Sequence, residues 1–263
     1  MELGVGDKGY LIVGGTSGMG LATAQILAAE GASVVLVGRD TARAERAMTS
    51  LRPASGARAK AVAADVHVEA DVATAVEAAV EFLGRLDGVA VMTGVSGHEP
   101  LTIGDSAWTA VFNDVLLGTV RVVRATLPHL TERGGTIVTT SAYSIRAPDA
   151  ARLPYTTLKA AVAVFTKGVA KTYGRQGVRA NCVCPGAIET EPLHQLRGQL
   201  AEQRGLPYEE AIERMMVDEW GLDVALGRPG KPEEVGELVA FLLSPRAGYL
   251  TGALVNIDGG TDF

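Results

Sequence analysis

The sequence predicts an α/β fold of the doubly wound, Rossmann-like class, a sheet of about seven parallel strands with helices on both faces. Short apolar segments rich in β-branched residues alternate along the chain with segments of helical periodicity, which is typical of a parallel sheet. A glycine-rich turn follows the first apolar segment, and there is no internal repeat or low-complexity tract. We therefore expect a single domain covering residues 1–263.

The elements follow from apolar spacing. Short, mostly apolar runs predict strands at 9–14, 33–38, 59–64, 86–92, 135–140, 178–184 and 253–257. Helical spacing and alanine content predict helices at 20–30, 43–52, 69–83, 106–131, 154–173 and 233–243. Pro232 followed by two glutamates marks a helix start. Glycines fall where helices should stop, at Gly31, Gly84, Gly174 and Gly177.

Residues 191–226 form the one long segment outside this alternation. The segment is polar, and helical pieces are expected around 196–204 and 209–219. Ligands of an open α/β sheet bind beyond the carboxyl ends of its strands, so an insertion after a strand is placed to cover a substrate. We expect a substrate-side helical lid here, with a purely structural excursion as the alternative.

Composition and charge exclude several function classes. The formal net charge is −6 and no basic run occurs, so nucleic acid and anionic membrane are not expected as partners. Apolar runs end well before the roughly 18 residues that span a bilayer, and residues 1–8 lack the pattern of a secretory signal. We expect a cytoplasmic protein without a metal site. Cys182 and Cys184 are expected to be buried free thiols that point to opposite faces of the sheet.

The glycine-rich run after the first strand predicts a dinucleotide site. A backbone without side chains can approach a pyrophosphate, and the helix that follows offers free N–H groups and a partial positive charge. A tight turn without a ligand is the alternative. The cofactor-binding residues expected in this run are Gly14, Thr16, Ser17, Gly18, Met19 and Gly20.

The end of the second strand bears on the choice of cofactor. An acidic residue there would bind the ribose hydroxyls of NAD(H), whereas an arginine holds the 2′-phosphate of NADP(H). Gly38 lacks a carboxylate and Arg39 supplies a cation, which favours NADP(H) over NAD(H), unless Arg39 is only a solvated surface residue. Asp65 is placed to meet the adenine amino group, with helix capping as its alternative role, and Val66 beside it is also expected to bind the cofactor.

Tyr155 and Lys159 lie four residues apart in a helical segment, so both project from one face. Each unit by which the phenol pKa falls below about 10 corresponds to about 1.4 kcal/mol of phenolate stabilisation, which a neighbouring ammonium can supply. Tyr155 could then exchange a proton with a substrate oxygen while a nicotinamide exchanges hydride with its carbon. The strand upstream ends in hydroxyl groups at Ser141, a suitable place for a donor to that oxygen.

These motifs, in this order, resemble those of the short-chain dehydrogenase/reductase family over essentially the whole chain. The similar segments are the glycine-rich turn, the run Tyr155-Thr156-Thr157-Leu158-Lys159, the run from Asn181 to Thr190, and the C-terminal glycines around Asp258. The resemblance implies hydride transfer between NAD(P)(H) and a ketone or secondary alcohol. It also implies a homotetramer or homodimer, built through helices 106–131 and 154–173 and the last strand.

The resemblance assigns roles to individual residues. Ser141 orients the carbonyl, Tyr155 is the acid/base, and Lys159 binds the nicotinamide ribose and tunes Tyr155. Gly94 lies beside the cofactor. The residues implied on the nicotinamide side are Pro185, Gly186, Ile188 and Thr190, of which Ile188 and Thr190 contact the carboxamide.

The chain departs from the family's pattern at two catalytic positions. The family's catalytic Asn falls on Val115, and Asn113 would point about 200° away on a regular helix. Ungapped alignment from Tyr155 puts Ala142 at the place of the serine. A loop longer by one residue would restore Ser141, and Ser144 is the fallback.

The sequence thus favours an active dehydrogenase/reductase over two alternatives. One is a nucleotide-binding regulatory or scaffold protein with weak or lost catalysis, which Val115 supports best; the other is different chemistry on the same scaffold. Substrate identity is not determined by the sequence. We expect the lid to set it, with His98, Tyr143 and Arg152 as candidate rim residues.

Overall fold

The computed structural model describes residues 2–94, 100–148, 150–218 and 224–261. Its centre is a seven-stranded sheet in the order β3-β2-β1-β4-β5-β6-β7, and all neighbouring strands are parallel. This order confirms the predicted doubly wound class. The strands are β1 (Gly9–Val13), β2 (Ser33–Gly38), β3 (Ala59–Ala63), β4 (Gly88–Val91), β5 (Gly135–Thr140), β6 (Val178–Pro185) and β7 (Leu254–Ile257).

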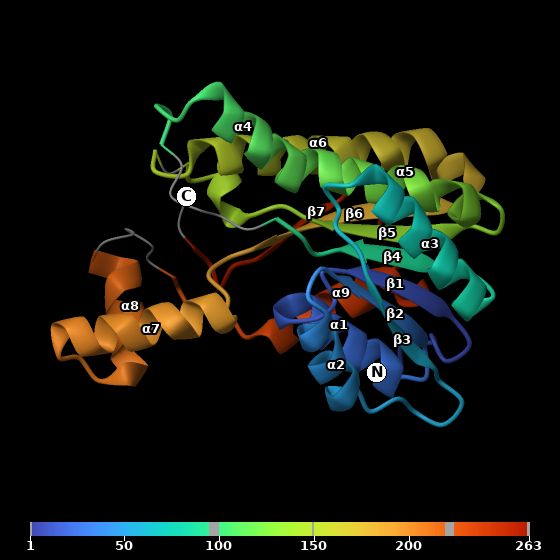
Figure 1. The fold of residues 1–263 in the computed structure, drawn as a ribbon, viewed down its shortest axis with the longest axis horizontal. Helices are drawn as coiled ribbons and strands as arrows, with labels where there is room; N and C mark the ends of the chain where they lie inside the picture. Colours follow the sequence, from blue (N-terminus) through green and yellow to red (C-terminus); the bar gives the residue numbers. More distant parts are fainter. Residues whose placement is uncertain (1, 95–99, 149, 219–223, 262–263) are drawn as a thin grey trace.

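Helices cover both faces of the sheet (Figure 1). One face carries α3 (Glu69–Leu83), α4 (Asp105–Phe112), α5 (Gly118–Thr131) and α6 (Leu153–Tyr173). The other carries α1 (Gly18–Ala29), α2 (Thr41–Ser50) and α9 (Pro232–Leu243). Each layer packs its own apolar cluster against the strands. The sheet is therefore buried on both sides, which explains why its strands read as near-continuous apolar runs.

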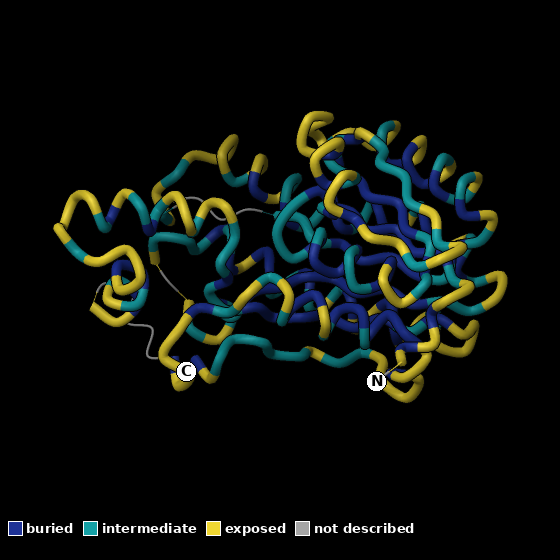
Figure 2. Tube along the Cα trace, turned by 90° about the horizontal axis from the view of Figure 1, so that it is seen from below, coloured by how far each residue is buried: buried dark blue, intermediate teal, exposed yellow. Residues whose placement is uncertain are grey.

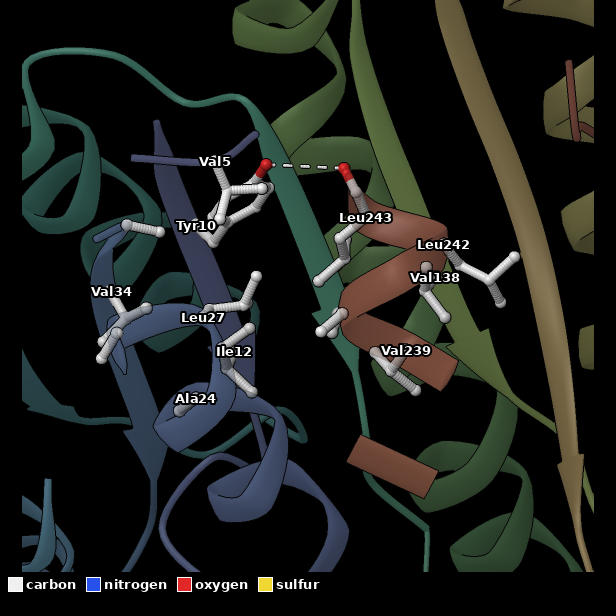
Figure 3. Packing of buried hydrophobic residues seen from close by; sticks show 14 of the residues in the cluster. Val5, Tyr10, Ile12, Ala24, Leu27, Val34, Val138, Val239, Leu242 and Leu243 are labelled. Carbon is white, nitrogen blue, oxygen red and sulfur yellow. Dashed lines mark hydrogen bonds between the residues drawn. The ribbon is translucent and has the colours of Figure 1, made fainter. Parts of the chain in front are cut away.

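Helix α9 closes the core beneath β1 and β5. Figure 3 shows Val239, Leu242 and Leu243 of this helix packed beside Ile12 and Val138, with the Tyr10 hydroxyl donating to the Leu243 carbonyl at 3.5 Å. Each large apolar side chain buried in this way stabilises the fold by roughly 1.5–3 kcal/mol relative to exposure. Helices α1 and α9 are in direct contact. The layer formed by α1, α2 and α9 therefore holds the glycine-rich turn at the start of α1 in place.

The predicted helix 106–131 is not continuous. Helix α4 ends at Phe112, a π-helical turn spans Asn113–Leu117, and α5 begins at Gly118. A Cβ at Gly118 would lie 3.0 Å from the Val66 side chain, so the helix runs hard against the loop after β3 at this point. The prediction of one regular helix is wrong here, and π-helical turns of this kind are frequent at functional sites.

Two further helices, α7 (Glu191–Arg204) and α8 (Tyr208–Asp218), follow β6 and project beyond the carboxyl edge of the sheet (Figure 1). Figure 2 shows long exposed stretches on these helices, in contrast to the buried strands. They enclose a small apolar cluster of their own around Leu200, Ile212 and Met216. Helix α7 starts earlier than predicted because Pro192 is compatible with a first helical turn. None of the described helices combines the length and apolar character needed to cross a bilayer.

Candidate active site

The glycine-rich turn is shaped by close contacts between backbone segments. A Cβ on Gly20 would overlap the Gly14 carbonyl, and a Cβ on Gly14 would lie 2.7 Å from the Met92 carbonyl oxygen. Gly14 and Gly18 have φ angles of 80° and 52°, which favour glycine. Ser17 is the N-cap of α1, and among the described residues its side chain makes no hydrogen bond to the helix. The first amides of α1 therefore face the turn, as anion binding requires.

The end of β2 presents a cation. Arg39 is exposed, whereas Asp40 caps α2 by accepting a hydrogen bond from the Arg43 backbone N–H at 2.9 Å. That bond lowers the pKa of Asp40. The space where a side chain at Gly38 would stand is filled by Thr16, whose Oγ1 lies 2.6 Å from an added Cβ. An acidic residue at Gly38 would therefore displace part of the glycine-rich turn.

The loop after β3 is stitched to the π-helical turn. The His67 Nε2 lies 3.0 Å from Asp114, and its Nδ1 lies 2.8 Å from Asp65. Asp65 also accepts from the His67 backbone N–H at 3.0 Å. The capping alternative for Asp65 does not apply to α3, whose N-cap is Val68. Asp65 thus stays a predicted adenine contact and the buried Val66 a predicted cofactor contact, and Asp65 is held by His67, which no pattern in the sequence indicated.

The nicotinamide-side segment lies against the glycine-rich turn. A Cβ on Gly18 would sit 3.1 Å from the methyl group of Thr190, which is also the N-cap of α7. Gly186 directly follows β6 and packs closely against the Asp258 backbone. A Cβ on Gly186 would lie 2.8 Å from the Asp258 Cα. Ile188 pairs with Gly230 in a short parallel bridge. Residues far apart in sequence are thereby brought to one place, as the motif order predicts.

Tyr155 and Lys159 lie together on the first turns of α6. The Lys159 Nζ is 5.5 Å from the centroid of the Tyr155 ring. Lys159 is 1% exposed, and its Nζ donates to the carbonyls of Thr93 at 3.0 Å and Thr140 at 2.9 Å. Burial lowers the pKa of Lys159 from 10.5 to about 8. These two carbonyl partners could not be predicted from the sequence, because a main-chain oxygen leaves no side-chain signal.

Val115 borders the same lysine. It is fully buried, and its Cγ2 lies 3.6 Å from a Cβ built on Gly94, while the Lys159 Nζ lies 3.0 Å from that point. The helix is irregular here, as an Asn113 substitute would require. The Asn113 Oδ1 nevertheless accepts from Arg121 at 2.6 Å, and Arg121 also donates to the Val66 carbonyl. Arg121 therefore ties α5 to both the π-helical turn and the loop after β3, and the Asn113 side-chain oxygen is used in that contact.

The three positions considered for the serine have different surroundings. The Ser141 hydroxyl, 2% exposed, donates to the Lys159 carbonyl at 2.8 Å. Ala142 offers no polar group. Ser144, on the 3-10 turn Tyr143–Ile145, accepts from the Thr156 hydroxyl at 3.0 Å, so its own proton is not used in that bond. The Ser141 proton is thus already used within the protein, whereas the bond to Thr156 leaves the Ser144 proton unused.

The two cysteines lie on one face of β6. Both are buried free thiols, as expected. The expectation that they point to opposite faces is wrong, because alternate residues of a strand share a face. Their contact lowers the pKa of Cys182 and raises that of Cys184. Within the described ranges, no group of three or more His, Cys, Asp and Glu side chains is placed to hold a metal ion.

The structure describes two of the three candidate rim residues. Tyr143 packs on the apolar cluster enclosed by α7 and α8. Arg152 is the N-cap of α6 and is partly buried. His98 lies outside the described residues. A glycine-rich turn at a helix N-terminus, at the carboxyl edge of a parallel sheet, defines a Rossmann-like protein of the dinucleotide-binding class.

Comparisons with known proteins narrow this class. A family model described as enoyl-(acyl carrier protein) reductase matches residues 13–262. The short-chain reductase protein NovJ of Streptomyces niveus is 35% identical over 252 residues, covering 95% of this chain and 92% of the relative. The A-factor type gamma-butyrolactone 1'-reductase of Streptomyces virginiae is 34% identical over 97% of this chain and 95% of its own.

Solved structures agree. The crystal structure of L-sorbose reductase from Gluconobacter frateurii, complexed with NADPH and L-sorbose, matches with a TM-score of 0.92 and 29% identity. The match covers 99% of this chain and 98% of that one. The chain belongs to the short-chain dehydrogenase/reductase family.

Proposed function

We propose that the protein is an NADP(H)-dependent oxidoreductase that interconverts a ketone and a secondary alcohol. The observation that carries the proposal is the pair formed by Tyr155 and Lys159 at the carboxyl edge of the sheet, with the ammonium 5.5 Å from the phenol ring. Its family relatives named above are reductases, which supports an oxidoreductase over a scaffold protein without catalysis.

The residues present fit NADP(H). Gly14, Gly18 and Gly20 leave a cradle that any Cβ would fill, and the open amides of α1 would hold the pyrophosphate. Arg39 would pair with the 2′-phosphate, since Asp40 is committed to its helix. The related sorbose reductase binds NADPH, which supports the same preference here, with NAD(H) as the alternative.

The chain's own groups would manage the proton. When bound, the nicotinamide supplies or accepts the hydride. In reduction, the Tyr155 phenol donates its proton to the carbonyl oxygen as that oxygen gains charge, and in oxidation Tyr155 takes the proton back. The Lys159 ammonium lowers the cost of the phenolate, and the carbonyls of Thr93 and Thr140 hold that ammonium in position. Ser144 would direct its free proton to the substrate oxygen, with Ser141 as the alternative.

The substrate, assembly and location belong to the same proposal. The segment 191–226 would cover the substrate, a small carbonyl compound or alcohol. Exposed apolar side chains at Val164 on α6 and Leu254 on β7 support assembly into a homotetramer or homodimer through these elements. The free thiols of Cys182 and Cys184 agree with a reducing, cytoplasmic location.

A panel of ketones and secondary alcohols, assayed with NADPH or NADP⁺ at the nicotinamide absorbance band, tests the proposal. We expect turnover of at least one ketone class, faster with NADPH than with NADH. Tight cofactor binding without turnover of any member would favour the regulatory or scaffold alternative. Sedimentation of the purified protein checks the assembly.

A further inference from the structure

A buried arginine ties the two lid helices to the nicotinamide-side segment. Arg197 on α7 is 6% exposed, and its Nη2 donates to Glu189 at 2.6 Å and to Glu213 on α8 at 3.1 Å. Its guanidinium also stacks over the Tyr208 ring, 5.5 Å from the centroid. One side chain therefore contacts α8 and the stretch that leaves β6, as well as its own helix.

This cluster differs from an ordinary surface ion pair. One buried cation faces two partly exposed carboxylates, and burying a charge is unfavourable unless all polar atoms find partners. The Arg197 Nε and the Glu213 Oε2 are buried without a partner among the described residues. By contrast, Arg214 and Glu210 on α8 form an exposed i,i+4 pair. Stability alone therefore gives no reason for burying the Arg197 guanidinium between two partly exposed glutamates.

The position of Glu189 suggests a reason. It stands between Ile188 and Thr190, and its backbone N–H donates to the Gly230 carbonyl at 2.8 Å. Thr190 in turn lies against Gly18 of the glycine-rich turn. Any ligand that orders this stretch of chain also fixes the carboxylate to which Arg197 is bound.

We propose that Arg197 is a positioning residue that couples closure of the lid to occupation of the nicotinamide side of the site, acting through Glu189. The inference rests on the proposed function, since it requires a cofactor at residues 185–190. Coupling of two equilibria is reciprocal. The cofactor would order α7 and α8, and a closed lid would in turn hold the cofactor more tightly.

Hydrogen exchange of lid peptides with and without NADP⁺ tests this without any turnover. In the wild type we expect NADP⁺ to slow exchange across residues 191–218 by about fivefold or more, the low end of usual coupling factors. In Arg197→Met, NADP⁺ should slow the exchange much less. This variant should also bind NADP⁺ up to about fivefold more weakly than the wild type. Arg197→Lys should recover part of the slowing, because the charge returns without the forked geometry.

The matched control is Glu210→Gln, which breaks the exposed pair between Glu210 and Arg214 on α8. This variant should show the same slowing of hydrogen exchange by NADP⁺ as the wild type. Equal slowing in the wild type and in Arg197→Met would overturn the proposal. The proposal would also fail if NADP⁺ bound the wild type without slowing hydrogen exchange across residues 191–218. That outcome would leave the proposed function intact. If the wild type did not bind NADP⁺ at all, both would fail. Should Arg197→Met not fold, Glu213→Gln carries the same test with the packing retained.

Discussion

The Ser141 hydroxyl donates to the main-chain carbonyl of Lys159 at 2.8 Å, across the contact between the end of β5 and helix α6. The bond joins the strand whose Thr140 carbonyl holds the Lys159 ammonium to the helix that carries the same lysine. Ser141 and Thr140 together therefore fix the main-chain carbonyl and the ammonium of Lys159 relative to the sheet. A hydroxyl has a single proton to donate, and here it is already used.

Replacing the two serines should separate structure from catalysis. Ser141→Ala removes a buried hydrogen bond to a carbonyl that keeps its helical partner, so we expect a loss of about 0.5–1.5 kcal/mol in unfolding free energy and a smaller loss of turnover. Ser144→Ala should cost a similar amount of stability, because the Thr156 hydroxyl loses its acceptor, but should also lower kcat by about 10²-fold or more, the usual cost of losing a donor to a developing oxyanion. Denaturation and steady-state kinetics measure both. A Ser141→Ala enzyme of full stability and no turnover would restore Ser141 to the catalytic role.

Arg39→Ala should weaken NADPH binding by roughly 1.5–3 kcal/mol, the value of a hydrogen bond to a charged group. NADH binding should hardly change, because NADH has no 2′-phosphate to lose. Titration of both cofactors into wild type and variant gives the comparison. Tighter binding of NADH than NADPH by the wild type would show that Arg39 is only a surface residue.

Lys159 should make stability depend on pH in a defined window. Burial lowers its pKa from 10.5 to about 8, so between these values the unfolded chain binds more protons than the folded one. The contribution of Lys159 to the free energy of unfolding therefore rises with pH across this window. Below the window, the folded protein bears the full free-energy cost of burying the charged ammonium.

The measurement is denaturation of the wild type and Lys159→Met at several pH values. At about 1.4 kcal/mol per pKa unit, the wild type should gain roughly 3 kcal/mol relative to the variant between about pH 7 and pH 11. Titration of all other groups cancels in this difference. A difference that does not change with pH would mean that the ammonium is not desolvated as its burial indicates.

Local patterns in the sequence predicted most of the fold. Strand and helix positions follow from apolar spacing, which each segment carries in itself. The π-helical turn could not be predicted in this way. It lies where Gly118 packs against Val66, and these two residues belong to different elements. Any local pattern there is compatible with a regular helix.

The candidate site divides in the same way. The spacing of Tyr155 and Lys159 is a helical property and placed them together, although their roles stay predictions. The surroundings of Lys159 are set by main-chain carbonyls of Thr93 and Thr140, which any residue type would supply. Arg197 could not be identified from the sequence, because Glu189 and Glu213 meet it only in the folded protein.

Val115→Ala should reduce stability without changing how protons reach solvent. The side chain is fully buried in an apolar cluster with Leu158 and Val162, so losing two carbons should cost about 2 kcal/mol. A valine has neither donor nor acceptor, and we expect the pH dependence of turnover to keep its shape. A proton-limited loss like that of an acid/base variant, in a folded protein, would contradict this.

Tyr155→Phe is the sharpest test of the proposed chemistry. The change removes the hydroxyl and keeps the ring, which packs against the apolar cluster around Val115 and lies beside Lys159. NADP(H) should therefore bind with nearly wild-type affinity. Since acid–base assistance is typically worth about 10²–10⁴ in rate, turnover of a ketone that the wild type reduces should fall at least that far, in the chemical step.

Lys159→Ala provides the contrast to Tyr155→Phe. It removes the ammonium that supports the phenolate and leaves two buried carbonyls unpaired, so both cofactor binding and turnover should weaken. Single-turnover kinetics separates the chemical step from binding in each variant. Full turnover by Tyr155→Phe would end the acid/base assignment and remove the observation on which the proposed function rests, because no other described side chain has been placed to exchange that proton.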